Sequence, residues 1–195
     1  RDWLIDAGIE ASSIAAASVF TVGDPTAMPR KLREAVRAEA APTIDGLHLC
    51  EAGEPGPYAD AEDPTRGCSG VSTAFSEIQG LVSLPQFQDG TPPFKTPADG
   101  GAIHTDGGGD PQVERTEQVV FSLTVPKFQA MPADGWPILL YAHGTGGNYR
   151  SFVSNDVAEV LSDVELDDGT HVNFAILSID AVMHGPRRNP DGFEQ

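Results

Sequence analysis

One stretch of the sequence constrains the fold more than any other, an apolar run that ends in a glycine-rich turn at residues 138–153, ILLYAHGTGGNYRSFV. Residues 137–143 are apolar almost throughout, which is typical of a strand buried on both faces in the middle of a mainly parallel sheet. After the glycines, residues 150–164 predict a helix, because their apolar positions fall on one helical face. These positions are Phe152, Val153, Val157, Val160, Leu161 and Val164.

A second apolar run, VNFAILSID, follows at residues 172–180, after the turn-forming residues DDGTH. It predicts another buried strand. Strand, glycine turn, helix and strand make a βαβ unit, so we predict the α/β fold class with a mainly parallel sheet.

The chain before this unit predicts shorter elements joined by irregular segments. Asp24 and Pro25 predict a helix start, with Asp24 as the N-cap and Pro25 as the first helical residue. Strands are predicted around residues 17–22 and over residues 78–84. A third is predicted over residues 118–126, where alternation makes one face the better buried. That face comprises Val119, Phe121, Leu123 and Val125.

Two cysteines, Cys50 and Cys68, bracket a segment rich in glycine, proline and acidic residues. This placement predicts a disulfide that closes the loop, the alternative being two unpaired thiols. A disulfide in turn predicts an oxidising location, which means a secreted, periplasmic or cell-surface protein. The cysteine spacing fits no metal motif built from paired Cys-x-x-Cys units, and we predict no metal and no cofactor.

The net charge of −17 argues against a nucleic-acid partner, because such a surface repels phosphates. No apolar run reaches the roughly 18 residues of a membrane span, so no transmembrane segment is predicted. Asp106 and Asp110 lie in a Gly/Asp-rich stretch that could hold calcium. The twelve-residue spacing of a calcium loop is absent, which favours a simple turn.

The glycine turn of residues 144–147 does not fit the two common nucleotide-binding motifs. Tyr149 stands where G-x-G-x-x-G requires its last glycine, and the phosphate loop G-x-x-x-x-G-K-[ST] is absent. An oxyanion hole fits better. Acyl transfer builds negative charge on a carbonyl oxygen, fixed backbone N–H donors stabilise that charge, and glycines let the backbone approach the substrate closely.

Two motifs occur in order, GWPILLYAHGTGG at residues 135–147 and FAILSIDAVMHGPRR at residues 174–188. Together they resemble the α/β-hydrolase superfamily, and are similar to large secreted bacterial esterases and lipases with a long N-terminal elaboration. The likeness extends more weakly to LPQFQDGTPPF and VVFSLTVP, and covers about residues 81–188. We therefore divide the chain into an irregular N-terminal elaboration, residues 1–80, and the first strands and helix of a hydrolase domain, residues 81–195.

The resemblance implies roles for the residues of these motifs. The N–H groups of Thr145 and Gly146 face the oxyanion. Supporting turn residues are His143, Gly144, Gly147, Asp180 and His184, with Asp180 bracing the loop after its strand. His143 is not the expected base, because the catalytic histidine comes last in the chain of this superfamily.

The sequence departs from the superfamily pattern at the nucleophile. The motif G-x-S-x-G does not occur; the nearest string, residues 67–71, lacks the final glycine and precedes the oxyanion motif. The expectation is therefore a serine esterase or lipase acting on carboxylic esters, with its Ser, acid and His on a C-terminal polypeptide of the same precursor. The alternatives are a non-catalytic secreted binding module and amidase or peptidase chemistry.

Overall fold

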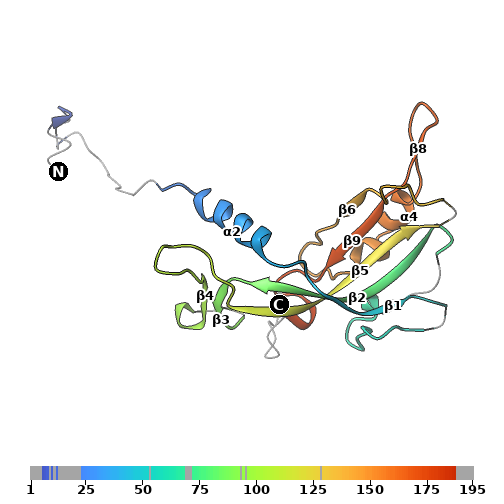
Figure 1. Cartoon of the computed structure of the whole chain (residues 1–195), viewed down its shortest axis with the longest axis horizontal. Helices are drawn as coiled ribbons and strands as arrows, with labels where there is room; N and C mark the ends of the chain where they lie inside the picture. Colours follow the sequence, from blue (N-terminus) through green and yellow to red (C-terminus); the bar gives the residue numbers. More distant parts are fainter. Residues whose placement is uncertain are drawn as a thin grey trace.

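A five-stranded mixed sheet, with the strand order β1-β2-β5-β9-β6, forms the centre of the protein (Figure 1). The computed structural model describes residues 6–8, 10, 12, 23–52, 54–68, 72–92, 94, 96–127 and 129–187. The strand expected around residues 17–22 lies outside them. The strands of the sheet are β1 (Ile44–Leu49), β2 (Phe75–Gln86), β5 (Arg115–Pro126), β9 (Ala175–Ile179) and β6 (Ile138–Leu140).

The strand directions contradict the mainly parallel sheet of an α/β-hydrolase. β2 and β5 pair antiparallel along their whole length, from Phe75 opposite Pro126 to Gln86 opposite Arg115. β1 with β2 and β5 with β9 are antiparallel as well, which leaves β6 with β9 as the parallel pair of this sheet. The apolar run of residues 137–143 was misleading, because β6 is a short edge strand whose Ile138 and Leu140 side chains are exposed.

The parallel pair is nevertheless connected through helices, as the βαβ pattern predicted. The single helix predicted over residues 150–164 is wrong: it is two short helices, α3 (Ser151–Ser154) and α4 (Val157–Leu161). Asp156 interrupts it with a left-handed backbone, φ +61°. After this break Val160 points into solvent and Val164 begins a strand, whereas Phe152 and Leu161 still face the core.

The main hydrophobic cluster lies on the face of the sheet where α3 and α4 pack, which we call the helix face. Its buried members are Phe75, Phe152, Ala158 and Ile176. The register places Gln79, Ser122 and Ser178 in one row on this same face, and all three are buried. The predicted burial within β5 therefore needs correction, since Ser122 and Thr124 are more completely buried than Leu123 and Val125.

Two hairpins and one helix extend from the sheet (Figure 1). β3 (Gln88–Gly90) pairs with β4 (Gly100–Ile103), and β7 (Val164–Glu165) pairs with β8 (His171–Val172). Helix α2 (Ala27–Ala38) has Thr26 at its N-cap rather than Asp24, whose carboxylate instead accepts from the Thr26 N–H. The 3-10 helices are η2 (Pro64–Arg66), η3 (Pro97–Asp99) and η4 (Gly185–Arg187).

The disulfide predicted between Cys50 and Cys68 is confirmed, and it closes the loop between β1 and β2. The boundary drawn at residue 80 falls inside β2, a strand of the central sheet. Among the described residues, none of the helices has the length and apolar character needed to cross a membrane.

Candidate active site

The glycine turn follows β6 directly and reverses the chain before α3. The Gly147 N–H donates to the Gly144 carbonyl at 3.0 Å, which closes a four-residue turn. Gly146, the third residue, has φ +77°, the conformation that a type II turn requires and that glycine adopts without strain. A Cβ on Gly147 would lie 2.8 Å from Ser151 Oγ, so close packing demands glycine there too.

The turn offers backbone donors that the described residues do not use. In the described part of the chain, the N–H groups of Gly144, Thr145 and Gly146 have no acceptor. All three residues are exposed and line an open, mostly polar cavity of about 350 Å³. The other lining residues include Thr65, Tyr141, Ser151 and Asn155. Unused, fixed N–H groups at a cavity are what stabilising an oxyanion needs.

His143 holds the turn against the neighbouring strand. Its Nε2 accepts from the Ala181 N–H at 3.0 Å, just beyond β9, and its Nδ1 contacts the Gly144 carbonyl at 3.0 Å. These two partners require a neutral ring with the proton on Nδ1. His184 packs edge-on against this ring, 4.7 Å between centroids. With both ring nitrogens occupied, His143 is positioned to shape the turn rather than to transfer a proton.

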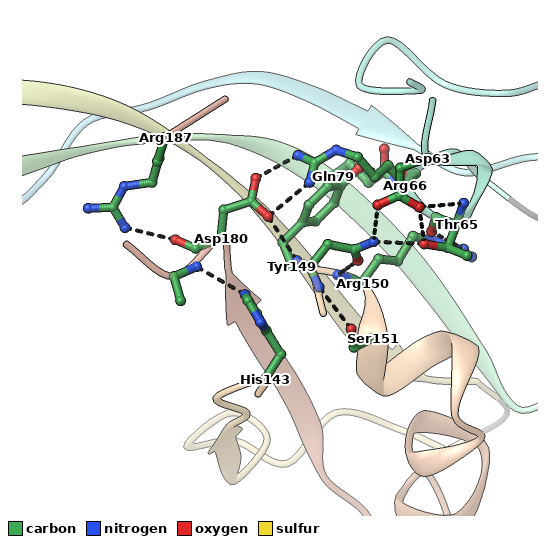
Figure 2. A network of polar contacts seen from close by, with 12 residues as sticks. Asp63, Thr65, Arg66, Gln79, His143, Tyr149, Arg150, Ser151, Asp180 and Arg187 are labelled. Carbon is green, nitrogen blue, oxygen red and sulfur yellow. Dashed lines mark hydrogen bonds and ion pairs between the residues drawn. The ribbon is translucent and has the colours of Figure 1, made fainter. Parts of the chain in front are cut away.

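Asp180 lies at the end of β9 and is fully buried. Its carboxylate forms two hydrogen bonds with the Arg66 guanidinium, at 2.6 and 3.1 Å, and accepts from the Tyr149 N–H at 3.0 Å (Figure 2). Burial alone would lower the pKa of Arg66, but the hydrogen bonds and charge of Asp180 raise it above its usual value. Gly185 covers the pair with φ +52°, and a Cβ there would lie 2.6 Å from both side chains.

A second buried ion pair joins α3 to the sheet. Arg150 donates to both carboxylate oxygens of Glu77, at 2.7 and 2.9 Å, and Ser122 and Gln79 donate to the same carboxylate.

Tyr149 lies between the two pairs, with its ring 4.8 Å from the Arg66 guanidinium carbon. Burial raises the pKa of the Tyr149 hydroxyl, which donates to the Arg66 carbonyl. The two arginines and two carboxylates thus neutralise each other inside the protein.

The disulfide loop forms one wall of the site. Asn148, next to the glycine turn, donates to Asp63 at 2.9 Å and to Thr65 at 2.7 Å. Arg150 donates to the Thr65 carbonyl at 3.2 Å. A second cavity of about 290 Å³ lies between Asp60, Glu62 and Asp63 of the loop and the glycine turn. A loop distant in sequence is therefore fixed against the turn by partly buried hydrogen bonds.

The structure brings the predicted oxyanion and supporting residues into one region, around the ends of β6 and β9. Cys50 and Cys68 lie farther along the loop and anchor it. Sequence reasoning missed Arg66, Glu77, Tyr149 and Arg150. One signal was available: Glu77 and Gln79 alternate along β2 in the same way as Ser122 and Thr124 along β5, which indicates a polar row on one face.

No nucleophile is assembled at this site within the described residues. Among them no serine, threonine or cysteine side chain is hydrogen-bonded to a histidine, and Ser69 lies outside them. No family model, curated protein or solved structure matches this chain.

Proposed function

We propose that this chain supplies the oxyanion hole of a secreted carboxylic-ester hydrolase related to the α/β-hydrolase superfamily. The observation that carries the proposal is the glycine turn, where the N–H groups of Gly144, Thr145 and Gly146 lie at the mouth of a cavity and have no acceptor among the described residues. The disulfide is compatible with an extracellular location.

The chemistry assigned to the turn is electrostatic. A serine hydroxyl passes its proton to a base on its own polypeptide, which later gives that proton to the departing alcohol; the serine oxygen attacks the ester carbonyl carbon, and the carbonyl oxygen takes up negative charge in the tetrahedral intermediate. The N–H groups of Thr145 and Gly146 then donate to that oxygen. They need no reorganisation because His143 and Ser151 fix the turn from both sides. Collapse of the intermediate expels the alcohol and leaves an acyl-enzyme, which water hydrolyses. One such donor contributes about 3 to 4 kcal/mol to the barrier reduction.

The nucleophile is proposed to lie on a further polypeptide that packs against the sheet. β6 is an edge strand among the described residues, so its outer backbone groups could pair with another strand. Its Ile138 and Leu140 side chains, 62% and 75% exposed, continue an apolar face that Leu177 of β9 and Leu123 of β5 share. A polypeptide that covers this face and extends the sheet beyond β6 would bring a serine to the glycine turn.

A non-catalytic binding module is the second candidate. The observation in its favour is the lack of a serine–histidine pair among the described residues. In that case the donors of the glycine turn bind a carboxylate or carbonyl oxygen of a ligand without transforming it.

Labelling with a fluorophosphonate probe separates the two candidates. The protein is isolated from its native source, reacted with the probe and separated by gel filtration. The proposal predicts a labelled serine on a polypeptide that co-elutes with this chain, and hydrolysis of p-nitrophenyl esters by the same fraction. An intact native assembly with neither labelled serine nor ester turnover would contradict the esterase and favour the binding module.

A further inference from the structure

We propose that Asp89, His104 and Glu114 form a binding site for a divalent transition-metal ion. The three residues lie where the β3–β4 hairpin meets the start of β5, at the far end of the sheet from the β7–β8 hairpin (Figure 1). Asp89 is in β3, His104 follows β4, and Glu114 precedes β5. The site is separate from the glycine turn, and the proposal does not depend on the ester hydrolase.

The potential ligand atoms already lie close to one another. The Nδ1 atom of His104 lies 2.7 Å from an Asp89 carboxylate oxygen and 3.3 Å from a Glu114 carboxylate oxygen. One potential ligand atom from each residue lies within 4.8 Å of the others. In a tetrahedral zinc site with bonds near 2.0–2.1 Å, neighbouring ligand atoms are about 3.3 Å apart. His104 and Glu114 have this spacing, Asp89 lies about 0.6 Å closer to His104 than it requires, and the Asp89 and Glu114 oxygens lie within 4.8 Å of each other, so the two carboxylates adjust their positions when the ion binds.

Backbone hydrogen bonds hold the segments that carry these side chains. The His104 N–H donates to the Phe87 carbonyl at 2.7 Å, and the Glu114 N–H donates to the Gln86 carbonyl at 2.8 Å. Gln88, directly before Asp89, pairs with Ile103 in the hairpin. The three side chains are therefore presented together by ordered backbone, which reduces the conformational entropy lost when an ion binds.

The charge of the cluster favours a cation. Two carboxylates face one imidazole, so even a protonated His104 leaves one net negative charge. The nearby Arg115 guanidinium is directed elsewhere, since it donates to the Gln88 and Gly90 carbonyls and pairs with Glu117. A divalent ion bound by a neutral imidazole and both carboxylates would neutralise the cluster.

The ligand set selects the kind of ion. One imidazole nitrogen with two carboxylate oxygens suits zinc, cobalt or manganese better than calcium or magnesium, which take oxygen ligands. The side chains are 38% to 44% exposed, which leaves room for water as a further ligand. By joining β3, the end of β4 and the start of β5, the ion would stabilise the hairpin against the sheet.

The chain contains a matched control in the β7–β8 hairpin. His171 Nδ1 lies 2.7 Å from an Asp163 carboxylate oxygen, the same distance as in the His104–Asp89 pair, and is similarly exposed. It differs in being outside the three-ligand cluster found among the described residues. Two ligands from an exposed surface pair bind a metal ion weakly, so His171 separates a built site from general affinity of surface histidines.

Equilibrium dialysis of the full chain against zinc, followed by metal analysis, tests the proposal and tolerates self-association. We expect one tightly bound zinc per chain in the parent and in His171→Ala. In His104→Ala the affinity should fall by about 100-fold or more, and in Glu114→Gln by at least about tenfold. Cobalt should give the visible absorption of a bound nitrogen–oxygen site in the parent but not in His104→Ala.

Circular dichroism of each variant checks that the fold is retained. Should His104→Ala not fold, Glu114→Gln gives the decisive comparison, because its amide preserves the size of the side chain. Equal zinc binding by the parent and both cluster variants would overturn the proposal. Equal losses in His171→Ala and His104→Ala would overturn it as well, since they would indicate unspecific binding.

Discussion

Thr145 can test the oxyanion assignment at a single backbone atom. Thr145→Pro removes the N–H and restrains φ, whereas Thr145→Ser retains the N–H and the hydroxyl. In the complete ester-hydrolysing protein, we expect Thr145→Pro to lower kcat by about 100-fold or more and Thr145→Ser to have a mild effect. Steady-state hydrolysis of p-nitrophenyl esters measures both. Parent-like kcat in Thr145→Pro would remove Thr145 from the oxyanion hole.

The Asp180 carboxylate joins the end of β9 to two other segments of the site, since it accepts from the Arg66 guanidinium and from the Tyr149 N–H. Removing one partner of a buried ion pair leaves an uncompensated charge. We therefore expect Asp180→Ala to lower the free energy of unfolding by about 3–5 kcal/mol. Urea unfolding followed by circular dichroism measures this loss.

The matched control for Asp180 is the exposed pair of Asp24 and Arg30, whose side chains are 51% and 56% accessible. Exposed pairs contribute little because water screens them, so Asp24→Ala, which also removes an exposed hydrogen bond to the Thr26 N–H, should lower stability much less than Asp180→Ala. Similar destabilisation by the two substitutions would mean that the Arg66–Asp180 pair does not anchor the disulfide loop.

At the scale of elements, the disulfide loop is the segment whose position the site depends on. Its ends are joined by Cys50 and Cys68, 18 residues apart, and its Thr65 and Arg66 bond to residues after the glycine turn or to Asp180. Closing a loop of this length contributes about 3 kcal/mol, mainly by restricting the unfolded chain. The double variant Cys50→Ser/Cys68→Ser should lose about this amount.

Amide hydrogen exchange measures the local effect of the same double variant. The Tyr149 N–H, which is bonded to Asp180, should exchange faster once the loop loosens. The β2 and β5 amides in the centre of the sheet serve as the internal reference. Stability equal to the parent under oxidising conditions would show that the buried ion pairs hold the loop without the crosslink.

The elements that sequence reasoning predicted correctly are those with a local signal. The Gly-rich turn, the strands on either side of the α3–α4 segment and the disulfide all follow from residues close together in the chain. Strand direction does not: β2 and β5 pair antiparallel through contacts that span the hairpin β3–β4, and no local pattern encodes them. The break at Asp156 was missed because the apolar residues between 152 and 161 are spaced in the sequence as in a continuous helix, and this spacing does not reveal the left-handed backbone of Asp156.

The candidate site divides in the same way. The residues of the glycine turn could be predicted from the sequence because they are consecutive. Arg66 and Asp180, 114 positions apart, are brought together by the tertiary fold. Buried charged residues are also not predicted from hydrophobicity, because arginine and glutamate are normally expected on the surface.

At the scale of the whole molecule, one face of the central sheet, which we call the open face, favours binding to a partner. This open face comprises Ile138, Leu140, Leu177, Ile179, Leu123 and Ile78, which the register places on the side opposite α3 and α4. Apolar side chains gathered on one face, next to a free strand edge, favour association. We expect the chain expressed alone to self-associate and to lack ester hydrolysis.

Charged substitutions locate that association on the open face. Leu140→Lys should make the lone chain more monomeric in sedimentation velocity, because lysine at this 75% exposed edge position disfavours both apolar contact and strand addition. Val160→Lys is the control: Val160 is 64% exposed, but on α4, away from the open face, and should leave self-association unchanged. In the native assembly Leu140→Lys should also release the serine-bearing polypeptide and abolish ester turnover, while Val160→Lys should do neither. A lone chain that is monomeric without substitution, or an assembly that survives Leu140→Lys, would show that this face is not where the catalytic polypeptide binds.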